Sequence, residues 1–425
     1  MDPKIYAAYV DILQEELVPA MGCTEPISVA YAGALARKTL GTRPERVELC
    51  VSGNIIKNVK SVIVPHTGGR KGLKVAVCAG ICCGAADQEL EVLAQVSEAQ
   101  LQELDTYMDQ VTLTIAESDA NCPFDIQVTV YGGAESAYVR IIGHHTNVVS
   151  LKKNHQVLQE TPFSDDVIQV PENRKLLSVE NIVAFANEVR IPDVAPVLRR
   201  QIDYNMAIAQ AGMAGKYGAT IGKILLKSYG NSIQNRAKAW AAAGSDARMS
   251  GCELPVVINS GSGNQGMTAS IPVIVYAKEM EASDDAMYRA LVVSNLVTIH
   301  LKTGIGSLSA YCGATSAGCG AGAGICYLYG GGLDEISHTI VNALAINSGM
   351  ICDGAKASCA AKIASAVEAG LLGMQMYMHD SQFYDGDGIV IKGVENTIRA
   401  VSQIAREGMR GTDQEIIQLM IDGNP

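Results

Sequence analysis

Two patterns of hydrophobic residues divide the chain near residue 177. Before that point, short runs rich in Val, Ile and Thr alternate with polar residues, as in "DIQVTVYG" (125–132) and "AYVRIIG" (137–143). After it, long Ala-rich runs follow helical spacing, as in "AMYRALVVSNLVTIHLK" (286–302). Alternation predicts strands with one solvated face, whereas helical spacing predicts packed helices. We therefore predict an α+β fold: an N-terminal α/β domain with a mostly antiparallel sheet and a C-terminal all-helical bundle domain.

The boundary between these two parts is polar and contains two prolines. Residues 152–174 lack a clear hydrophobic period, which is typical of a linker. We predict an α/β substrate-binding domain at 1–155 and a helical domain at 175–425. Within the first domain, hydrophobic spacing predicts helices at 5–18 and 26–39. Further strands are expected in "RVELCVS" (46–52), "SVIVP" (61–65) and "QVTLTIAES" (110–118).

Composition and charge exclude several classes of partner. The net charge of −11 argues against nucleic acid, which favours basic patches. Apolar stretches are interrupted before about 18 residues, so we expect no membrane partner. The N-terminus has no apolar leader, so we expect a cytoplasmic protein whose twelve cysteines are reduced. Aromatic residues make up only 5%, and the 42 glycines predict helices that pack by close backbone approach.

The run "CGATSAGCGAGAGIC" (312–326) places three cysteines seven residues apart. Fourteen residues of helix span about 21 Å, so Cys312 and Cys326 cannot bind one metal if this run is helical. The same spacing suits a buried face of small residues that would include Cys319. Packing thiols and metal ligands both remain open from spacing alone.

A second pair of cysteines follows in "CDGAKASC" (352–359). Asp353–Gly354 is a strong turn signal, and a turn there would bring Cys352 and Cys359 together. The spacing does not match the paired cysteines of zinc fingers. It is compatible with a cluster held by three dispersed thiolates.

Three polar stretches have the composition of small-ligand loops. They are "PAMGCTEP" (19–26), "SGNIIKN" with "VPHTGGRKG" (52–58 and 64–72), and "NSGSGNQG" (259–266). Backbone N–H groups at such turns and helix starts bind anions, although plain turns and caps are the alternative. The candidate side chains are Cys23, Thr24, Glu25, Ser52, Asn54, Lys57, His66, Thr67, Asn264 and Gln265. His300, just before the cysteine run, is a further candidate or a satisfied core histidine.

In this order, "GCTEP", "SGN", "PHTG", "GSGNQG", "LSAYCG" and "CDGAKASC" resemble the L-cysteine desulfidase family. That family is related to the alpha portion of the iron–sulfur L-serine dehydratases. The resemblance covers nearly the whole chain, and "GCTEP" with "CDGAKASC" is its most specific part. It implies β-elimination from an amino acid with a [4Fe-4S] cluster in place of pyridoxal phosphate (no PLP).

The resemblance also implies roles for individual residues. It places the cluster in the helical domain on Cys312, Cys352 and Cys359, with Cys319 as the alternative first ligand. It makes Cys23 the base that removes the Cα proton, and we expect the adjacent helix N-terminus to lower the pKa of Cys23. No cysteine follows Cys359, so we expect no C-terminal cysteine as a fourth ligand.

The expected reaction converts L-cysteine and water to pyruvate, hydrogen sulfide and ammonia. Two alternatives remain open: an iron–sulfur L-serine or L-threonine dehydratase, and a non-catalytic metal- or small-molecule-binding protein. The small amino-acid substrate is the expected partner. A homodimer is the expected assembly, because two-fold symmetry is the commonest.

Overall fold

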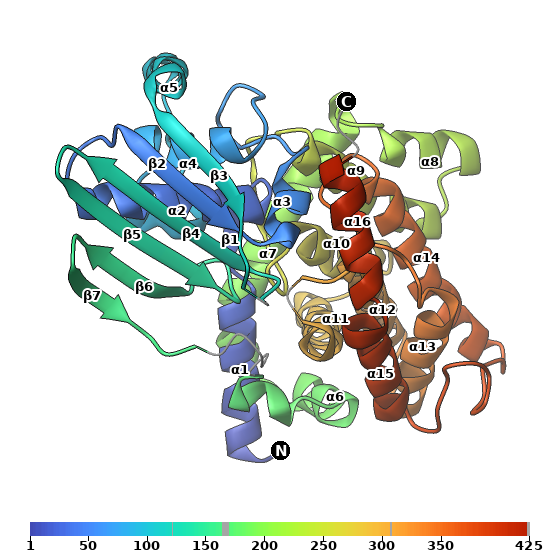
Figure 1. The fold of residues 1–425 in the computed structure, drawn as a ribbon. Helices are drawn as coiled ribbons and strands as arrows, with labels where there is room; N and C mark the ends of the chain where they lie inside the picture. Colours follow the sequence, from blue (N-terminus) through green and yellow to red (C-terminus); the bar gives the residue numbers. More distant parts are fainter. Residues whose placement is uncertain (121, 164–169, 307, 423–425) are drawn as a thin grey trace.

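The computed structural model describes residues 1–120, 122–163, 170–306 and 308–422. Figure 1 shows a sheet on one side of the molecule and a helical region on the other. The six strands of the sheet follow in the spatial order β3 (Thr112–Glu117), β2 (Arg46–Val51), β4 (Asp125–Gly132), β5 (Glu135–Ile142), β6 (Val148–Lys153) and β7 (Gln156–Glu160). Only β2 and β3 pair in parallel, so the mostly antiparallel sheet is confirmed.

One face of this sheet is covered by helices because alternate residues of its central strands are apolar. In β2, Val47, Leu49 and Val51 are buried. Helix α2 packs on β4 and β5, and α4 packs on α2. The helices of this region are α1 (Pro3–Glu16), α2 (Thr24–Leu40), α3 (Gly53–Val59), α4 (Leu73–Cys83) and α5 (Glu98–Gln110), with a 3-10 turn at Ala86–Glu91. Both helices expected near the N-terminus, at 5–18 and 26–39, are therefore present.

Two expectations for the N-terminal half are wrong. The run 61–65 forms no strand, and only an isolated bridge joins Ile63 to Lys71. The tight turns on either side leave this segment no partner strand. Part of the expected linker at 152–174 belongs to the sheet, because β7 pairs with β6. Residues 164–169 lie outside the described residues.

The second half is helical apart from β8 (Pro255–Val257), which pairs antiparallel with β1 (Pro19–Met21). The expected all-helical bundle therefore contains one short strand, and that strand ties it to the N-terminal segment. The helices are α6 (Val179–Glu188), α7 (Ile191–Ala214), α8 (Ile221–Tyr229), α9 (Ile233–Met249), α10 (Gly263–Glu279), α11 (Asp284–Ile305), α12 (Gly313–Leu328), α13 (Leu333–Ile346), α14 (Cys359–Met378), α15 (Val394–Gln403) and α16 (Arg410–Asp422), with short turns at Glu172–Leu176 and Ile404–Gly408.

The small-residue helix α12 lies at the centre of the helical region. It contacts α10, α11, α13 and α14, and its residues from 314 to 326 are all buried. Glycine and alanine allow such close packing because their side chains are small or absent, so neighbouring helix backbones can approach each other closely. Helix α16 returns to the other half and packs on α3, as Figure 1 shows. Among the described residues, no helix has the length and apolar character needed to cross a membrane.

Candidate active site

Cys312 and Cys352 lie side by side because the backbone segments that carry them pair. The Cys312 N–H donates to the Met350 carbonyl at 3.0 Å, and the Cys352 N–H donates to the Ala310 carbonyl at 2.6 Å. Cys312 is also the residue at which α12 begins, in the N-cap position. The Cys312 thiol donates a hydrogen bond to the sulfur of Cys352. Two residues distant in the chain therefore present their thiols to one another.

Cys359 reaches this pair through the predicted turn at Asp353–Gly354. Gly354 has a φ of +92°, and a Cβ added there would lie 2.6 Å from the Lys57 carbonyl oxygen, so the turn requires glycine. The chain then enters α14 at Cys359, whose Sγ lies 3.7 Å from the Gly354 carbonyl oxygen. The charge of Cys359 raises the pKa of Cys312, and the charge of Cys352 raises the pKa of Cys359. We call Cys312, Cys352 and Cys359 the cysteine group.

Lysines from separate elements surround the cysteine group. The hydrogen bond from Cys312 lowers the pKa of Cys352 to about 6, and the charges of Lys57 on α3 and Lys362 on α14 act in the same direction. Burial lowers the pKa of Lys302 on α11 to about 8, while the neighbouring thiols oppose this change. Positive charge favours the thiolate of Cys352, whereas the hydrogen bond to Cys352 raises the pKa of Cys312 and burial raises that of Cys359.

The other two cysteines of the run 312–326 lie inside α12. Cys319 and Cys326 are both buried, and burial raises the pKa of Cys319 to about 12 and that of Cys326 to about 11. Helix α12 carries them away from Cys312 along its axis. These two thiols form part of the small-residue packing face.

Cys23 lies near the cysteine group, and its pKa is shifted in the opposite direction from that of Cys352. It packs in a small apolar cluster with Val62 and Met249, and Cys359 packs against the same cluster. Burial raises the pKa of Cys23 well above its usual value, and the charge of Glu25 raises it further. We expected the start of α2 to lower this pKa. That expectation is wrong, because desolvation and the adjacent carboxylate outweigh the helix end.

Glu25 connects Cys23 to its surroundings. The Cys23 thiol donates to Oε2 of Glu25 at 3.1 Å, and Nδ2 of Asn58 donates to Oε1 at 3.1 Å. The neighbouring Thr24 hydroxyl donates to the Gly261 carbonyl at 2.9 Å. The stretches "GCTEP" and "NSGSGNQG" therefore meet at one place, as a shared binding site requires.

Asn54 and Lys57, within residues 52–57, bind Asp413, a residue far away in the sequence. Nδ2 of Asn54 donates to Oδ2 of Asp413 at 2.8 Å, and the Lys57 ammonium binds Oδ1 of the same carboxylate at 2.5 Å. Ser52 donates to the Pro123 carbonyl at 2.7 Å. Helix α16 thus places a carboxylate on the two side chains that we expected to bind an anionic ligand.

The "PHTG" stretch forms a tight turn. The Thr67 hydroxyl donates to the Val64 carbonyl at 2.7 Å, as in the turn alternative. His66 has a φ of +54°, and its Nδ1 lies 3.7 Å from Oε1 of Glu253. The buried Nε2 of His66 has no hydrogen-bond partner among the described residues.

Asn264 and Gln265 lie in the first turn of α10, at the end of "NSGSGNQG". Their side-chain oxygens are buried and have no partner in the part of the chain that the structure describes. A Cβ added to Gly313 would lie 2.6 Å from Cδ of Gln265, which places Gln265 beside the start of α12. Buried acceptors without partners are costly, so both amides are suited to bind a ligand.

His300 is held by a different partner. Its Nε2 lies 2.8 Å from Oε2 of Glu395, and Oε1 of the same carboxylate accepts the Val179 N–H at 2.8 Å. This arrangement corresponds to the satisfied core histidine and joins α11, α15 and α6.

Three residues near the site were not anticipated from the sequence. They are Asp413, Arg248, whose Nε donates to the Gly22 carbonyl at 2.8 Å, and His145, whose carbonyl accepts from Ser28 at 2.6 Å. None of them lies in a stretch of unusual composition. Their positions depend on contacts between distant segments, and the adjacent pair of histidines at 144–145 is the only local signal.

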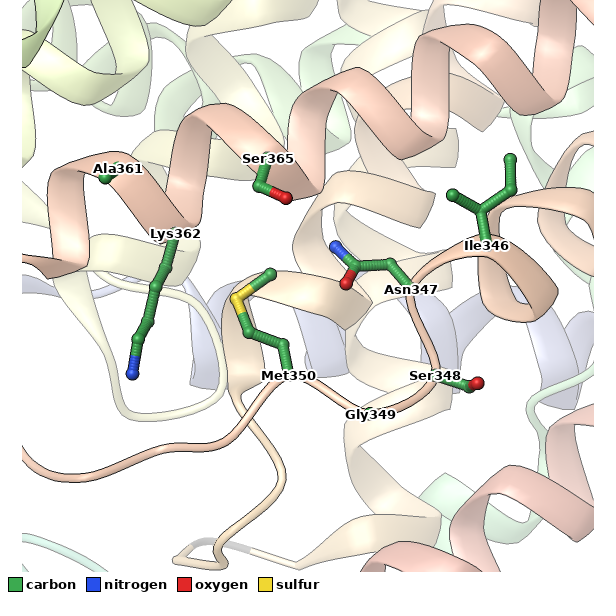
Figure 2. Close-up of a pocket in the computed structure, with 8 residues that line it drawn as sticks. All are labelled: Ile346, Asn347, Ser348, Gly349, Met350, Ala361, Lys362 and Ser365. Atoms are coloured by element: carbon green, nitrogen blue, oxygen red, sulfur yellow. The ribbon is translucent and has the colours of Figure 1, made fainter.

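An open pocket of about 550 Å³ lies on the α13–α14 side of the cysteine group. Figure 2 shows Asn347 and Met350 from the connecting loop facing Ser365 of α14, with Lys362 on the same helix. Met350 is the residue whose carbonyl accepts the Cys312 N–H. The pocket therefore adjoins the backbone that holds the cysteine group.

The thiols of the cysteine group are soft donors of the type that binds iron–sulfur clusters. Among residues 1–120, 122–163, 170–306 and 308–422, no three His, Cys, Asp or Glu side chains are placed to hold one metal ion. An iron–sulfur cluster makes a different demand, because each thiolate binds a different iron. Three thiols are the kind of donor set that such clusters use.

Comparison with known proteins identifies the family. The family model "Serine dehydratase alpha chain" matches residues 87–418, which includes the cysteine group but not Cys23. A UPF0597 protein of Desulfitobacterium hafniense is 56% identical over 419 residues, covering 99% of this chain and 97% of its own length. UPF0597 proteins of Lachnoclostridium phytofermentans and Treponema denticola are 46% and 44% identical, and the alignments cover 98% and 99% of this chain and 100% and 99% of the relatives. The chain belongs to the serine dehydratase alpha chain family.

Proposed function

We propose that the protein is an L-cysteine desulfidase, which eliminates sulfide from L-cysteine to give pyruvate, hydrogen sulfide and ammonia. The observation that carries the proposal is the convergence of the cysteine group beside Cys23. The three thiols of the cysteine group lie within the part of the chain that matches the serine dehydratase alpha chain model. The choice of L-cysteine rests on the resemblance of "GCTEP" and "CDGAKASC" to the desulfidases.

Cys312, Cys352 and Cys359 would hold the [4Fe-4S] cluster. When bound, the cluster would supply an iron that acts as a Lewis acid toward the leaving group. Lys57 and Lys362 act electrostatically on Cys352, and Lys302 is buried beside Cys312 and Cys352. These ammonium groups would offset part of the negative charge of three thiolates, and Lys57 and Lys362 also pair with Asp413 and Asp353.

Cys23 and Glu25 act together as the base. The Cys23 thiol is protonated at neutral pH because burial raises its pKa, so it needs an acceptor for its own proton. Glu25 is placed for this role, since Oε2 already accepts the thiol hydrogen bond at 3.1 Å. The thiol proton moves to Glu25, and the resulting thiolate takes the Cα proton of the substrate. The electron pair of the Cα–H bond forms the new Cα=Cβ double bond. The Cβ–S bond breaks at the same time, and the sulfur leaves as hydrosulfide. The aminoacrylate product then hydrolyses to pyruvate and ammonia.

The test compares two substrates on anaerobically reconstituted protein. We expect sulfide and pyruvate in equal amounts from L-cysteine, and less than a tenth as much pyruvate from L-serine. The matched variants are Cys352→Ser, which should lose both products, and Cys319→Ala, which should retain them. Full sulfide release by Cys352→Ser would refute the ligand assignment.

An L-serine dehydratase is the second candidate, because the matching family model is named for that activity. The chemistry is the same except that hydroxide leaves Cβ. Pyruvate release from L-serine with negligible sulfide from L-cysteine would select this candidate instead.

A further inference from the structure

Arg248 is a buried charge whose hydrogen bonds are incomplete. It lies in the last turn of α9, and only 3% of the residue is exposed. Its Nε donates to the Gly22 carbonyl at 2.8 Å. Its Nη2 is buried without a hydrogen-bond partner, and within the described residues no carboxylate forms an ion pair with this guanidinium.

Burial of such a guanidinium has a large desolvation free energy. Arginine stays protonated inside proteins, so burial cannot be relieved by loss of the proton. A buried ion needs a counter-ion and full hydrogen bonding to offset its lost hydration. The charges of Glu25 and Arg248 both act on Cys23. The two carboxylate oxygens of Glu25, however, accept hydrogen bonds from Cys23 and Asn58. An anion from outside the chain would complete the site.

A second unpartnered group lies beside the same stretch. His145 is 4% exposed, and neither of its ring nitrogens has a hydrogen-bond partner in the described ranges. Phe124 packs edge-on against the ring at 4.8 Å, and His144 packs at 5.7 Å. A buried imidazole has one N–H to donate, and this one has nothing to receive it.

The side chains of His145 and Arg248 both lie against the turn formed by "NSGSGNQG". A Cβ added to Gly261 would lie 2.7 Å from Cε1 of His145, and one added to Gly263 would lie 2.5 Å from Nε of Arg248. Gly261 also has a φ of +77°. Because Gly261 and Gly263 have no Cβ, the side chains of His145 and Arg248 can both lie against this turn.

The turn and Arg248 are tied to the segment that carries Cys23. Arg248 binds the carbonyl of Gly22, the residue before Cys23, and Thr24, the residue after it, binds the carbonyl of Gly261. The charge of Arg248 acts on both Cys23 and His145. An anion bound by these donors would sit next to the Cys23 thiol.

We propose that Arg248 and His145 form a subsite that binds the carboxylate of a small amino or keto acid. Nη2 of Arg248 donates to one carboxylate oxygen, and the imidazole N–H of His145 donates to the other. The identification of this carboxylate with that of L-cysteine rests on the proposed function. In that case the Cα atom, one bond from the carboxylate carbon, is held beside the base. Arg248 and His145 then act as substrate-binding residues.

Binding to the full-length, metal-free protein tests the subsite without any turnover. The probes are L-alanine and pyruvate, with L-alaninamide and sulfate as controls, and the readouts are the melting temperature and titration calorimetry. We expect L-alanine and pyruvate to raise the melting temperature, and L-alaninamide to have no effect. Arg248→Gln should weaken binding of both probes at least tenfold, and His145→Gln several-fold.

A matched control separates lost binding from lost folding. Arg200 also donates to a backbone carbonyl, that of Leu17, and its buried Nε likewise has no partner among the described residues. Arg200→Gln should keep the affinity for L-alanine. Arg248→Met should melt no lower than the wild type without ligand, because it removes an unpaired buried charge, and it should no longer respond to L-alanine.

Unchanged affinity in Arg248→Gln would overturn the proposal, as would equal stabilisation by sulfate, which would indicate a general anion site. Carboxylate binding by Arg248 in a protein that eliminates nothing from L-cysteine or L-serine would leave the subsite standing and reject the proposed function. Elimination that survives Arg248→Gln with an unchanged KM would reject the subsite alone.

Discussion

Cys23 and Cys352 lie in neighbouring parts of one site, yet their thiols have opposite acidities. Burial and Glu25 raise the pKa of Cys23, whereas the Cys312 hydrogen bond, Lys57 and Lys362 lower that of Cys352 to about 6. Cys23 is the residue at a helix start, and Cys352 is in a loop. The comparison teaches that specific side-chain partners, and not the position at a helix end, decide which sulfur is anionic here.

The largest expected effect comes from removing the acceptor at Cys23. Glu25→Gln keeps the shape of the side chain but cannot take the thiol proton, so we expect kcat for sulfide release to fall at least about 100-fold. Iron content should equal that of the wild type, because the cysteine group is intact. A kcat within threefold of the wild type would show that Cys23 does not depend on Glu25.

Breaking the charge pair on the Cys352 side should reduce stability. The Lys57 side chain is 1% exposed and binds Asp413, which is 15% exposed. Asp413→Ala leaves a buried ammonium without its partner, and we expect the free energy of unfolding to fall by about 3 to 4 kcal/mol. Urea denaturation of the metal-free protein measures this loss.

The exposed pair of Arg46 and Glu48 provides the control for that measurement. Glu48→Ala should cost less than about 1 kcal/mol, because surface ion pairs contribute little. Equal losses in the two variants would contradict the buried pairing of α16 with α3.

A pH titration should reveal the buried histidine on the Cys23 side. Burial lowers the pKa of His145 from 6.5 to about 4, so between these pH values the unfolded chain binds more protons than the native protein. The free energy of unfolding therefore falls as the pH falls, by about 1.6 kcal/mol between pH 6.5 and 5. This contribution should be absent from His145→Gln, and a slope shared by both proteins would rule it out.

The smallest effect is expected inside α12. Cys319→Ala removes a buried thiol from the packing face, and we expect a loss of about 1 kcal/mol in unfolding free energy. Iron content and sulfide release should stay at wild-type levels. A loss of iron in this variant would restore Cys319 as the first cluster ligand.

The sequence predicts local features of this site well where a residue type alone determines them. The turn at Asp353–Gly354 follows from glycine, and the buried face with Cys319 and Cys326 is one of the two alternatives that their spacing allowed. The antiparallel sheet follows from the alternation of its strands. Such features depend on interactions within a few residues.

Long-range partners could not be predicted in the same way. The acidity of Cys23 depends on how deeply its thiol is buried. The hydrogen bonds of Asn54 and Lys57 depend on Asp413, which comes from the last helix. Strand β7 forms because β6 offers it an edge, although its own residues 156–160 are exposed and mostly polar. A single sequence without aligned relatives carries no signal for contacts of this kind.

Anaerobic reconstitution with iron and sulfide tests the central claim most directly. We expect the wild type to be brown and to bind about four irons per chain, with a broad absorption in the visible range. Cys312→Ser, Cys352→Ser and Cys359→Ser should each lose most of the iron and the colour, whereas Cys319→Ala should keep both. A colourless wild type, or full iron content in Cys352→Ser, would contradict the account.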